Sequence, residues 1–89
     1  AAIGLAQLLI RDRQWDQAQA LLTRAIEQGT SDRVAQATYW LGELHRAAGR
    51  AAEAADAYLS VVYLYPKEGE WVTRALAAAV LPAFQSAMA

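Results

Sequence analysis

The sequence predicts an all-α fold in a single small domain. Its 89 residues are too few for two independent cores, and 56% of them are hydrophobic and 19% charged, so the chain can bury one core. Alanine alone supplies 22 residues, and apolar side chains recur at helical spacing nearly throughout the chain. No stretch has the pattern of a strand. We therefore expect helices joined by short turns.

The first two helices are predicted over residues 2–12 and 15–28, with a polar joint at residues 12–14 between them. Gly29 follows the second helix and is predicted to cap it in the left-handed conformation. The second helix has one apolar face that we expect to be buried. That face consists of Ala18, Leu21, Leu22, Ala25 and Ile26.

The third and fourth helices are predicted over residues 32–48 and from 51 to 64 or 65. The side chains of residues 30–32 offer oxygens that can cap the start of the third helix, and Gly49 is expected to end it as Gly29 ends the second. Pro66 ends the fourth helix, because the residue before a proline is pushed out of the helical region.

A fifth helix is predicted over residues 71–81, after a turn at residues 67–70. Pro82 is expected to end or kink it, leaving residues 83–88 as a last turn. Because two to five residues join successive helices, neighbouring helices should be antiparallel.

Residues 35–68 form a helix–turn–helix unit of 34 residues, and helix packing explains where its small and aromatic residues occur. Glycine inside a helix costs about 1 kcal/mol, so Gly42 indicates a close approach of another helix. Ala54 would let the second helix sit tightly against the first, and Tyr58 would fill the gap between them. The marker residues of the unit are Leu41, Gly42, His45, Ala54, Tyr58, Val61 and Pro66.

An earlier, degraded copy of this unit lies 36 residues before it. Its matching residues are Leu5, Ala6, Leu9, Ala18, Leu22, Ala25 and Thr30. A third copy begins at about Trp71, with Ala75–Leu76 and Ala79–Val80 at the matching positions, and lacks a second helix. Position 1 falls inside the first helix and the chain lacks an initiator methionine, so we expect a processed product or a piece of a longer protein.

This spacing resembles the tetratricopeptide repeat. The resemblance implies a right-handed α–α superhelix, a solenoid of about two repeats, over residues 1–32 and 35–68, and a C-terminal capping helix over residues 70–88, all in one domain of residues 1–89. The segments 39–44 and 65–66 are similar to repeats of bacterial cell-envelope proteins of the TolA-binding coordinator and barrel-assembly lipoprotein types. That narrower likeness favours the periplasm or cell envelope over the cytoplasm.

The resemblance also implies a function. In the family, the first helix of each repeat lines a concave groove, so we expect a protein–protein interaction module that binds a protein, a peptide or a partner helix there. The expected lining residues are Ile3, Gln7, Ile10, Arg11, Gln36, Tyr39, Glu43 and Arg46, with Ala77 and Leu81 continuing the groove. The alternative for any one of them is an ordinary solvated face. An alternative for the whole chain is a structural, self-associating helical domain, which implies a homo-oligomer, or a fragment of a longer array.

Other function classes find little support in the sequence. The net charge is −1 and the basic residues are scattered, which argues against nucleic-acid binding, and no apolar run approaches the roughly 20 residues that cross a membrane. There are no cysteines and no clustered metal ligands, so we expect no metal, no cofactor and no catalytic residue. His45, the single histidine, is interpreted as a half-buried ring whose nitrogens are satisfied by water or backbone.

The aromatic residues and the paired acids are interpreted as structural. We expect the three tryptophans to be core residues, Trp15 and Trp71 packing across helix joints and Trp40 against the preceding unit. One of Tyr63 and Tyr65 is expected to be exposed. The pairs Asp12 and Asp16, and Glu68 and Glu70, are expected to be solvated or helix-capping groups.

Overall fold

A computed structural model describes the backbone of residues 2–88 and the side chains of residues 3–80. This part of the chain is helical apart from short joints and contains no strand. The bounds predicted for the first four helices are confirmed to within one residue. The five helices are α1 (Ala2–Arg11), α2 (Trp15–Gln28), α3 (Ser31–Ala47), α4 (Ala51–Leu64) and α5 (Gly69–Met88).

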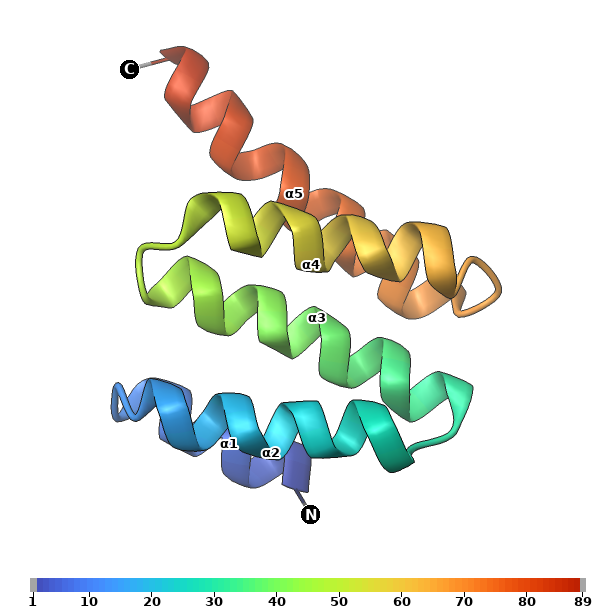
Figure 1. Cartoon of the computed structure of the whole chain (residues 1–89). Helices are drawn as coiled ribbons and strands as arrows, with labels where there is room; N and C mark the ends of the chain where they lie inside the picture. The colour runs from blue at the N-terminus through green and yellow to red at the C-terminus, as the bar shows by residue number, and fades with distance from the viewer. Residues whose placement is uncertain (1, 89) are drawn as a thin grey trace.

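The helices stack as antiparallel neighbours into an α-solenoid. Figure 1 shows α2, α3 and α4 one above another, with α1 behind α2 and α5 behind α4. Helix α3 contacts all four other helices, whereas α2 and α4 make no contact with each other. The odd-numbered helices are therefore closer together than the even-numbered ones, and they form the inner side of the curve.

Two apolar clusters make up the core, and α3 contributes to both of them. Ala37 and Leu44 of α3 pack with residues of α1 and α2 around the fully buried Leu22. Ala35, on another face of α3, packs with α4 and α5 around Tyr58. Because α3 carries apolar residues on two faces, it joins the two halves of the molecule.

The contact between α3 and α4 depends on the pairing of a glycine with a large ring. A Cβ atom placed on Gly42 would lie 2.5 Å from Cε1 of Tyr58, whose side chain is almost completely buried. The equivalent positions in the first repeat are Ala6 and Leu22, both fully buried in one cluster. The second repeat thus combines glycine with the larger side chain, Tyr58, and the first repeat combines alanine with the smaller side chain, Leu22.

Helix α3 ends in a Schellman motif at Gly49, as its sequence predicted. Gly49 has a φ of 81°, its N–H donates to the carbonyl of Arg46 at 3.1 Å, and the N–H of Arg50 donates to the carbonyl of His45 at 2.7 Å. No atom lies within 4 Å of a Cβ placed on Gly49, so the backbone angle is the reason for glycine here.

The same motif ends α1, 36 residues earlier, with arginine in place of glycine. Arg13 has a φ of 62°, and its backbone N–H donates to the carbonyl of Ile10 at 3.1 Å. The backbone N–H of Gln14 donates to the carbonyl of Leu9 at 2.8 Å. An L-residue with a side chain pays about 1–2 kcal/mol for this conformation. The first repeat therefore keeps the geometry of the second at a cost in stability.

Two of the predicted caps between α2 and α3 are wrong. Gly29 is extended, with φ −90° and ψ 168°, rather than left-handed. A Cβ there would lie 2.6 Å from the carbonyl oxygen of Ala25, so Gly29 allows a close approach of backbone. Thr30 is the N-cap residue of α3, but its side chain makes no capping hydrogen bond. Its carbonyl instead accepts the N–H of Val34 at 2.8 Å.

The bounds 71–81 predicted for the fifth helix from periodicity are too narrow, whereas the bounds 70–88 that the resemblance implied agree with the structure to within one residue. Helix α5 begins at Gly69, two residues early, because the carbonyl of Glu68 already accepts the N–H of Val72 at 2.9 Å. It then continues through Pro82 to Met88. A proline removes one backbone donor, and alanine is abundant on both sides of this one, so the surrounding helix propensity is high.

Exchanging the residues at the two equivalent caps should change stability in opposite directions. We expect Arg13→Gly to raise the free energy of unfolding by about 1 kcal/mol, because glycine adopts a positive φ without strain. We expect Gly49→Arg to lower it by a similar amount. Urea denaturation followed by circular dichroism measures both, and equal losses of stability in the two variants would contradict the assignment.

Candidate functional site

The residues that the sequence assigned to the groove of the second repeat share one face of α3. Gln36, Tyr39, Glu43 and Arg46 recur at intervals of three or four residues, which places them on successive turns of the same side. Arg46 is exposed and the other three are half-buried. Helix α3 thus offers solvent a strip of mixed aromatic and charged character on the inner side of the solenoid.

The assigned residues of α1 are placed less uniformly. Gln7 and Arg11 are exposed and Ile10 is half-buried. Ile3 is only 9% exposed and belongs to the cluster that α1, α2 and α3 share, so it presents little surface to a partner. On α5, Ala77 is exposed, and the side chain of Leu81 lies outside the described residues.

The ring of Tyr39 lies at the centre of an aromatic cluster. Its centroid lies 5.4 Å from that of Trp40, 5.9 Å from that of Tyr58 and 5.7 Å from that of Trp71. These rings come from α3, α4 and α5, and the pairs are tilted or edge-to-face, as aromatic pairs prefer. Tyr39 is therefore held in place by rings from three helices while it remains half-exposed.

The carboxylate of Glu43 is held by two partners, one on each oxygen. Its Oε1 accepts a hydrogen bond from the hydroxyl of Tyr58 at 2.6 Å, and its Oε2 accepts one from Nη2 of Arg46, also at 2.6 Å. Burial, and then the bond to Glu43, raise the pKa of Tyr58, so this hydroxyl stays protonated and donates. The Arg46 side chain remains 47% exposed while it is oriented.

A second arginine is oriented from α5. The guanidinium carbon of Arg74 lies 5.0 Å from the centroid of the Trp71 ring, and its Nη2 forms an ion pair with Oε1 of Glu70 at 3.2 Å. Burial and then the charge of Glu43 raise the pKa of Tyr39, while the charges of Arg46 and Arg74 oppose that rise. Arg74 is thus placed over Trp71, whose ring in turn packs against Tyr39.

We call this arrangement the inner site. It consists of Tyr39, Glu43 and Arg46 from α3 and Trp71 and Arg74 from α5. Chemically, it offers an aromatic surface with a guanidinium from each of two helices, and each guanidinium is oriented by a carboxylate. Among residues 3–80, no three metal-binding side chains are grouped to hold an ion.

Part of the inner site escaped the sequence analysis. Trp71 was expected in the core, where it lies, but its contact with Tyr39 was not foreseen. Arg74 was not singled out at all, although its spacing of four residues from Glu70 was a visible sign of an ion pair. The bond between Tyr58 and Glu43 joins residues 15 apart on different helices, and no local spacing indicates it.

The side chain of His45 is buried outside the inner site. It is 9% exposed, so the ring is buried rather than half-buried, and its Nδ1 has no protein hydrogen-bond partner among the described residues. Burial, followed by the charge of Arg50, lowers the pKa of His45 below its ordinary value of 6.5, and Glu53 opposes the shift. The neutral ring is thus the form that the fold accommodates.

The predictions that the tryptophans pack in the core and that one of Tyr63 and Tyr65 is exposed are confirmed. Trp15 and Trp40 pack against the cluster of α1, α2 and α3, and Trp71 is buried in the cluster of α3, α4 and α5. Tyr63 is exposed, whereas Tyr65 packs against the core. None of the helices, over the residues described, is both long and apolar enough to cross a membrane.

Comparison with known proteins gives one match. A family model described as tetratricopeptide repeat matches residues 3–69, a segment that extends from α1 to the first residue of α5. No match was found among curated proteins or among solved structures.

The burial of His45 predicts a loss of stability in mild acid. Because the pKa of His45 is lower in the folded chain than in the unfolded chain, the unfolded state binds the proton more readily. The free energy of unfolding should therefore fall as the pH drops below 6.5. Urea denaturation at about pH 7.5 and about pH 5.5 measures this fall. Both pH values lie above the range in which carboxylates titrate.

His45→Leu provides the matched control, because leucine occupies the equivalent position, Leu9, in the first repeat. This variant should lose much of the difference in stability between the two pH values. An unchanged difference would show that other groups cause it.

Proposed function

The chain belongs to the tetratricopeptide repeat family, and we propose that it is a protein–protein interaction module that binds a peptide or a partner helix in its concave groove. Repeats of this family generally mediate protein–protein interaction, and the family generally acts as a non-catalytic scaffold. The proposal adds to this a binding surface, which is the inner site together with Gln7, Ile10, Arg11 and Gln36.

The single observation that carries the proposal is the ordering of Arg46 in an exposed position. A free arginine side chain loses about 2 kcal/mol of rotamer entropy when it is immobilised by a ligand. The hydrogen bonds that Arg46 and the buried Tyr58 donate to Glu43 meet part of that cost before any partner arrives. A salt bridge of this kind on a merely solvated face contributes little to stability.

The free donors of the arginines indicate what the partner carries. A guanidinium has five N–H donors, and Arg46 uses one of them on Glu43. Arg74 forms an exposed ion pair with Glu70 through Nη2, and a ligand could accept from its other N–H groups. A carboxylate on the partner would accept from these donors, and an apolar side chain would pack against the rings of Tyr39 and Trp71.

Residues of α1 extend the same surface by one repeat. Gln7 and Ile10 stand 36 residues before Glu43 and Arg46, so they occupy the corresponding positions of the first repeat. Their amide and apolar side chains suit the backbone and the apolar residues of an extended or helical segment. A partner that crosses α1, α3 and α5 would contact all three.

The likeness to cell-envelope repeats stays a prediction from sequence and concerns location alone.

Selection of peptides from a random display library on the immobilised chain tests the proposal. We expect the selected peptides to contain an acidic residue beside an apolar one. Arg46→Ala should weaken their binding about tenfold, or about 1.4 kcal/mol, as measured by fluorescence anisotropy. Tyr39→Ala should also weaken binding, while circular dichroism shows that helicity is kept.

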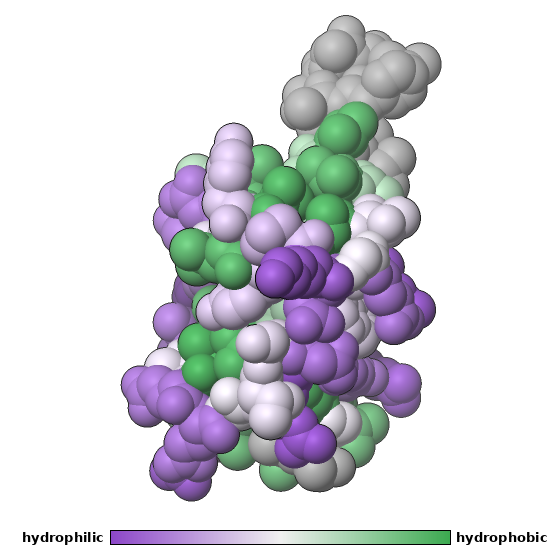
Figure 2. Space-filling model, turned by 90° about the vertical axis from the view of Figure 1, so that its right-hand side faces the viewer, coloured by the Kyte–Doolittle hydropathy of each residue, from purple (hydrophilic) through white to green (hydrophobic). Residues whose placement is uncertain are grey.

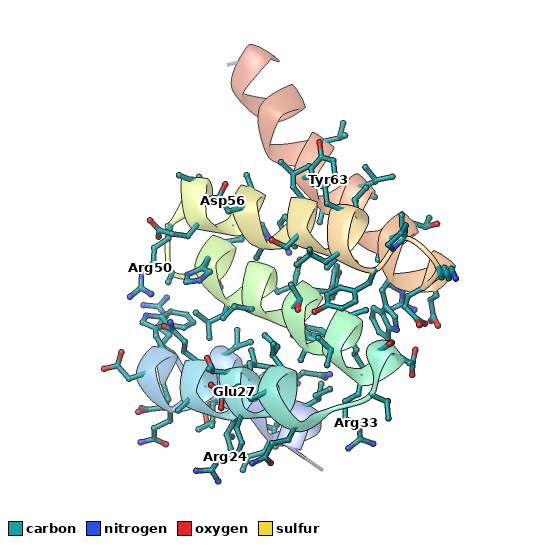
Figure 3. All side chains as sticks on the ribbon, turned by 45° about the vertical axis from the view of Figure 1, so that its right-hand side comes forward. Arg24, Glu27, Arg33, Arg50, Asp56 and Tyr63 are labelled. Atoms are coloured by element: carbon teal, nitrogen blue, oxygen red, sulfur yellow. The ribbon has the colours of Figure 1, made fainter. Side chains whose placement is uncertain are left out.

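Arg24→Ala is the matched control, because Arg24 is an exposed arginine of α2, away from the inner site (Figure 3). Its affinity for the selected peptides should equal that of the unsubstituted chain. Peptides that respond to Arg24→Ala and not to Arg46→Ala would contradict the proposal. So would a loss of affinity in Tyr39→Ala that merely follows a loss of folding.

A further inference from the structure

Helices α1 and α5 can each be placed in register with α3. The left-handed caps Arg13 and Gly49 lie 36 residues apart, which gives the register of α1. Leu44 is buried in the cluster with α2, and Ala78, 34 residues later, is buried in the cluster with α4, which gives the register of α5. Because successive helices are antiparallel, the three odd-numbered helices run in the same direction, and α3 contacts both of the others. Corresponding residues therefore lie at the same level on neighbouring helices.

In this register, one row of residues across the three helices is apolar, then cationic, then apolar. Arg46 of α3 corresponds to Ile10 of α1 and to Val80 of α5. Arg46 is exposed, Ile10 is half-buried and Val80 is 59% exposed. The end of the solenoid at which α2 joins α3 and α4 joins α5 is instead covered by a mixture of hydrophilic and hydrophobic residues (Figure 2). We call Ile10, Arg46 and Val80 the inner row.

The side of α5 that carries Val80 is not the side that a packed neighbouring helix covers. Helix α4 packs against α3 and still leaves Arg46 exposed, so the corresponding side of an odd-numbered helix stays open to solvent. Leu76, one turn before Val80, corresponds instead to Gly42, which faces the ring of Tyr58 in α4. Leu76 therefore does not belong to the inner row.

Two further arginines near the inner row lie off it. Arg74 of α5 is six residues before Val80, which is about 9 Å along the helix axis. Arg11 of α1 points about 100° around the helix axis from Ile10. The charge within the row is thus that of Arg46, with an apolar residue on either side of it.

The carboxylate of Glu43, one turn before Arg46, is satisfied within the protein. Its two oxygens accept hydrogen bonds from the hydroxyl of Tyr58 and from Nη2 of Arg46, each at 2.6 Å. Glu43 therefore orients the guanidinium, whose remaining N–H groups are left for a partner. A carboxylate on the partner offers these donors the planar, paired acceptors that a guanidinium matches best.

We propose that the inner row binds an extended segment of a partner protein, in which an acidic residue stands between two apolar residues that are three positions away on either side. This inference rests on the proposed function and names the kind of segment that the groove takes. The acidic side chain pairs with Arg46, and the apolar side chains pack on Ile10 and Val80. The acidic residue is an internal one, so the free carboxylate of a chain end plays no part.

The spacing of three follows from the distance between the helices. Helices in contact have axes about 8–10 Å apart, and α3 contacts both α1 and α5. A polyproline II segment has three residues per turn and rises about 3.1 Å per residue, so residues three apart share one side and lie about 9 Å apart. Same-side residues of a β-strand lie about 7 or about 13 Å apart.

An α-helical partner would need about seven residues to cover the same distance, and about 15 residues to cross the whole row. The polyproline II segment orders fewer residues and is already populated in unbound chains, so it loses less conformational entropy on binding. The extended form is therefore the one that fits the inner row at the lower cost.

Selection from a library of random segments, each displayed between fixed flanking sequences, tests the order and the spacing. We expect the selected segments to share an acidic residue with apolar residues three positions before and three positions after it. Replacing this acidic residue by its amide should weaken binding about tenfold, as measured by fluorescence anisotropy of the synthetic peptide.

Val80→Arg and Ile10→Arg test which helix each apolar residue contacts, because each copies Arg46 to one end of the row. Val80→Arg should prefer, by about tenfold, the selected peptide in which one of the two apolar residues is replaced by glutamate. Ile10→Arg should show the same preference for the other apolar residue. Leu8→Arg is the matched control, because it adds the same charge to an exposed residue on the opposite side of α1 from Ile10, and it should keep the original preference.

The outcomes separate this inference from the proposed function. Selected segments with the acidic residue outside the apolar pair, or with the seven-residue spacing of a helix, would overturn the inference and leave the interaction module standing. Row variants whose preferences equal that of Leu8→Arg would also overturn it. A chain that selects no segment at all would overturn the proposed function as well. Circular dichroism checks that each variant keeps its helicity, and if one row variant unfolds, the other gives the same test.

Discussion

The fit of the Tyr58 ring against the bare backbone of Gly42 is the contact on which the rest of this structure depends. It sets how closely α3 and α4 approach, because any side chain at position 42 would meet the ring at less than a normal contact distance. A glycine within a helix costs about 1 kcal/mol, so its presence needs a compensating gain, and the nearly complete burial of the tyrosine supplies one.

The same tyrosine links the core to the inner site. Its ring fills the space beside Gly42, while its hydroxyl emerges far enough to hold Glu43, which in turn orients Arg46. Tyr39 packs on this ring and on Trp71, so α5 is joined to the same group of side chains. Tyr58, which packs the two helices of its repeat together, thereby also positions the groups that a partner would contact. Leucine at the equivalent position of the first repeat, Leu22, has no hydroxyl with which to do this.

Much of the fold was predictable, because helical periodicity and punctuation by Gly49 and Pro66 are local properties of the sequence. The errors arose where one signal has several physical meanings. Glycine after a helix can serve a left-handed cap, as Gly49 does, or a close approach, as Gly29 does. Arginine as a residue type does not indicate a positive φ, so the conformation of Arg13 could not be predicted from it. Spacing along α3 placed four residues of the site on one face, whereas Trp71 and Arg74 join them only through tertiary packing, Trp71 against Tyr39 and Arg74 over Trp71.

A double-mutant cycle on Gly42 and Tyr58 tests the central contact most directly. The variants are Gly42→Ala, Tyr58→Leu and the two combined, which recreate in the second repeat the pair Ala6 and Leu22 of the first. We predict that Gly42→Ala lowers the free energy of unfolding by about 2 kcal/mol beside tyrosine. Beside leucine it should cost nothing or stabilise, because alanine favours the helix by about 1 kcal/mol. An equal cost in both backgrounds would contradict the account.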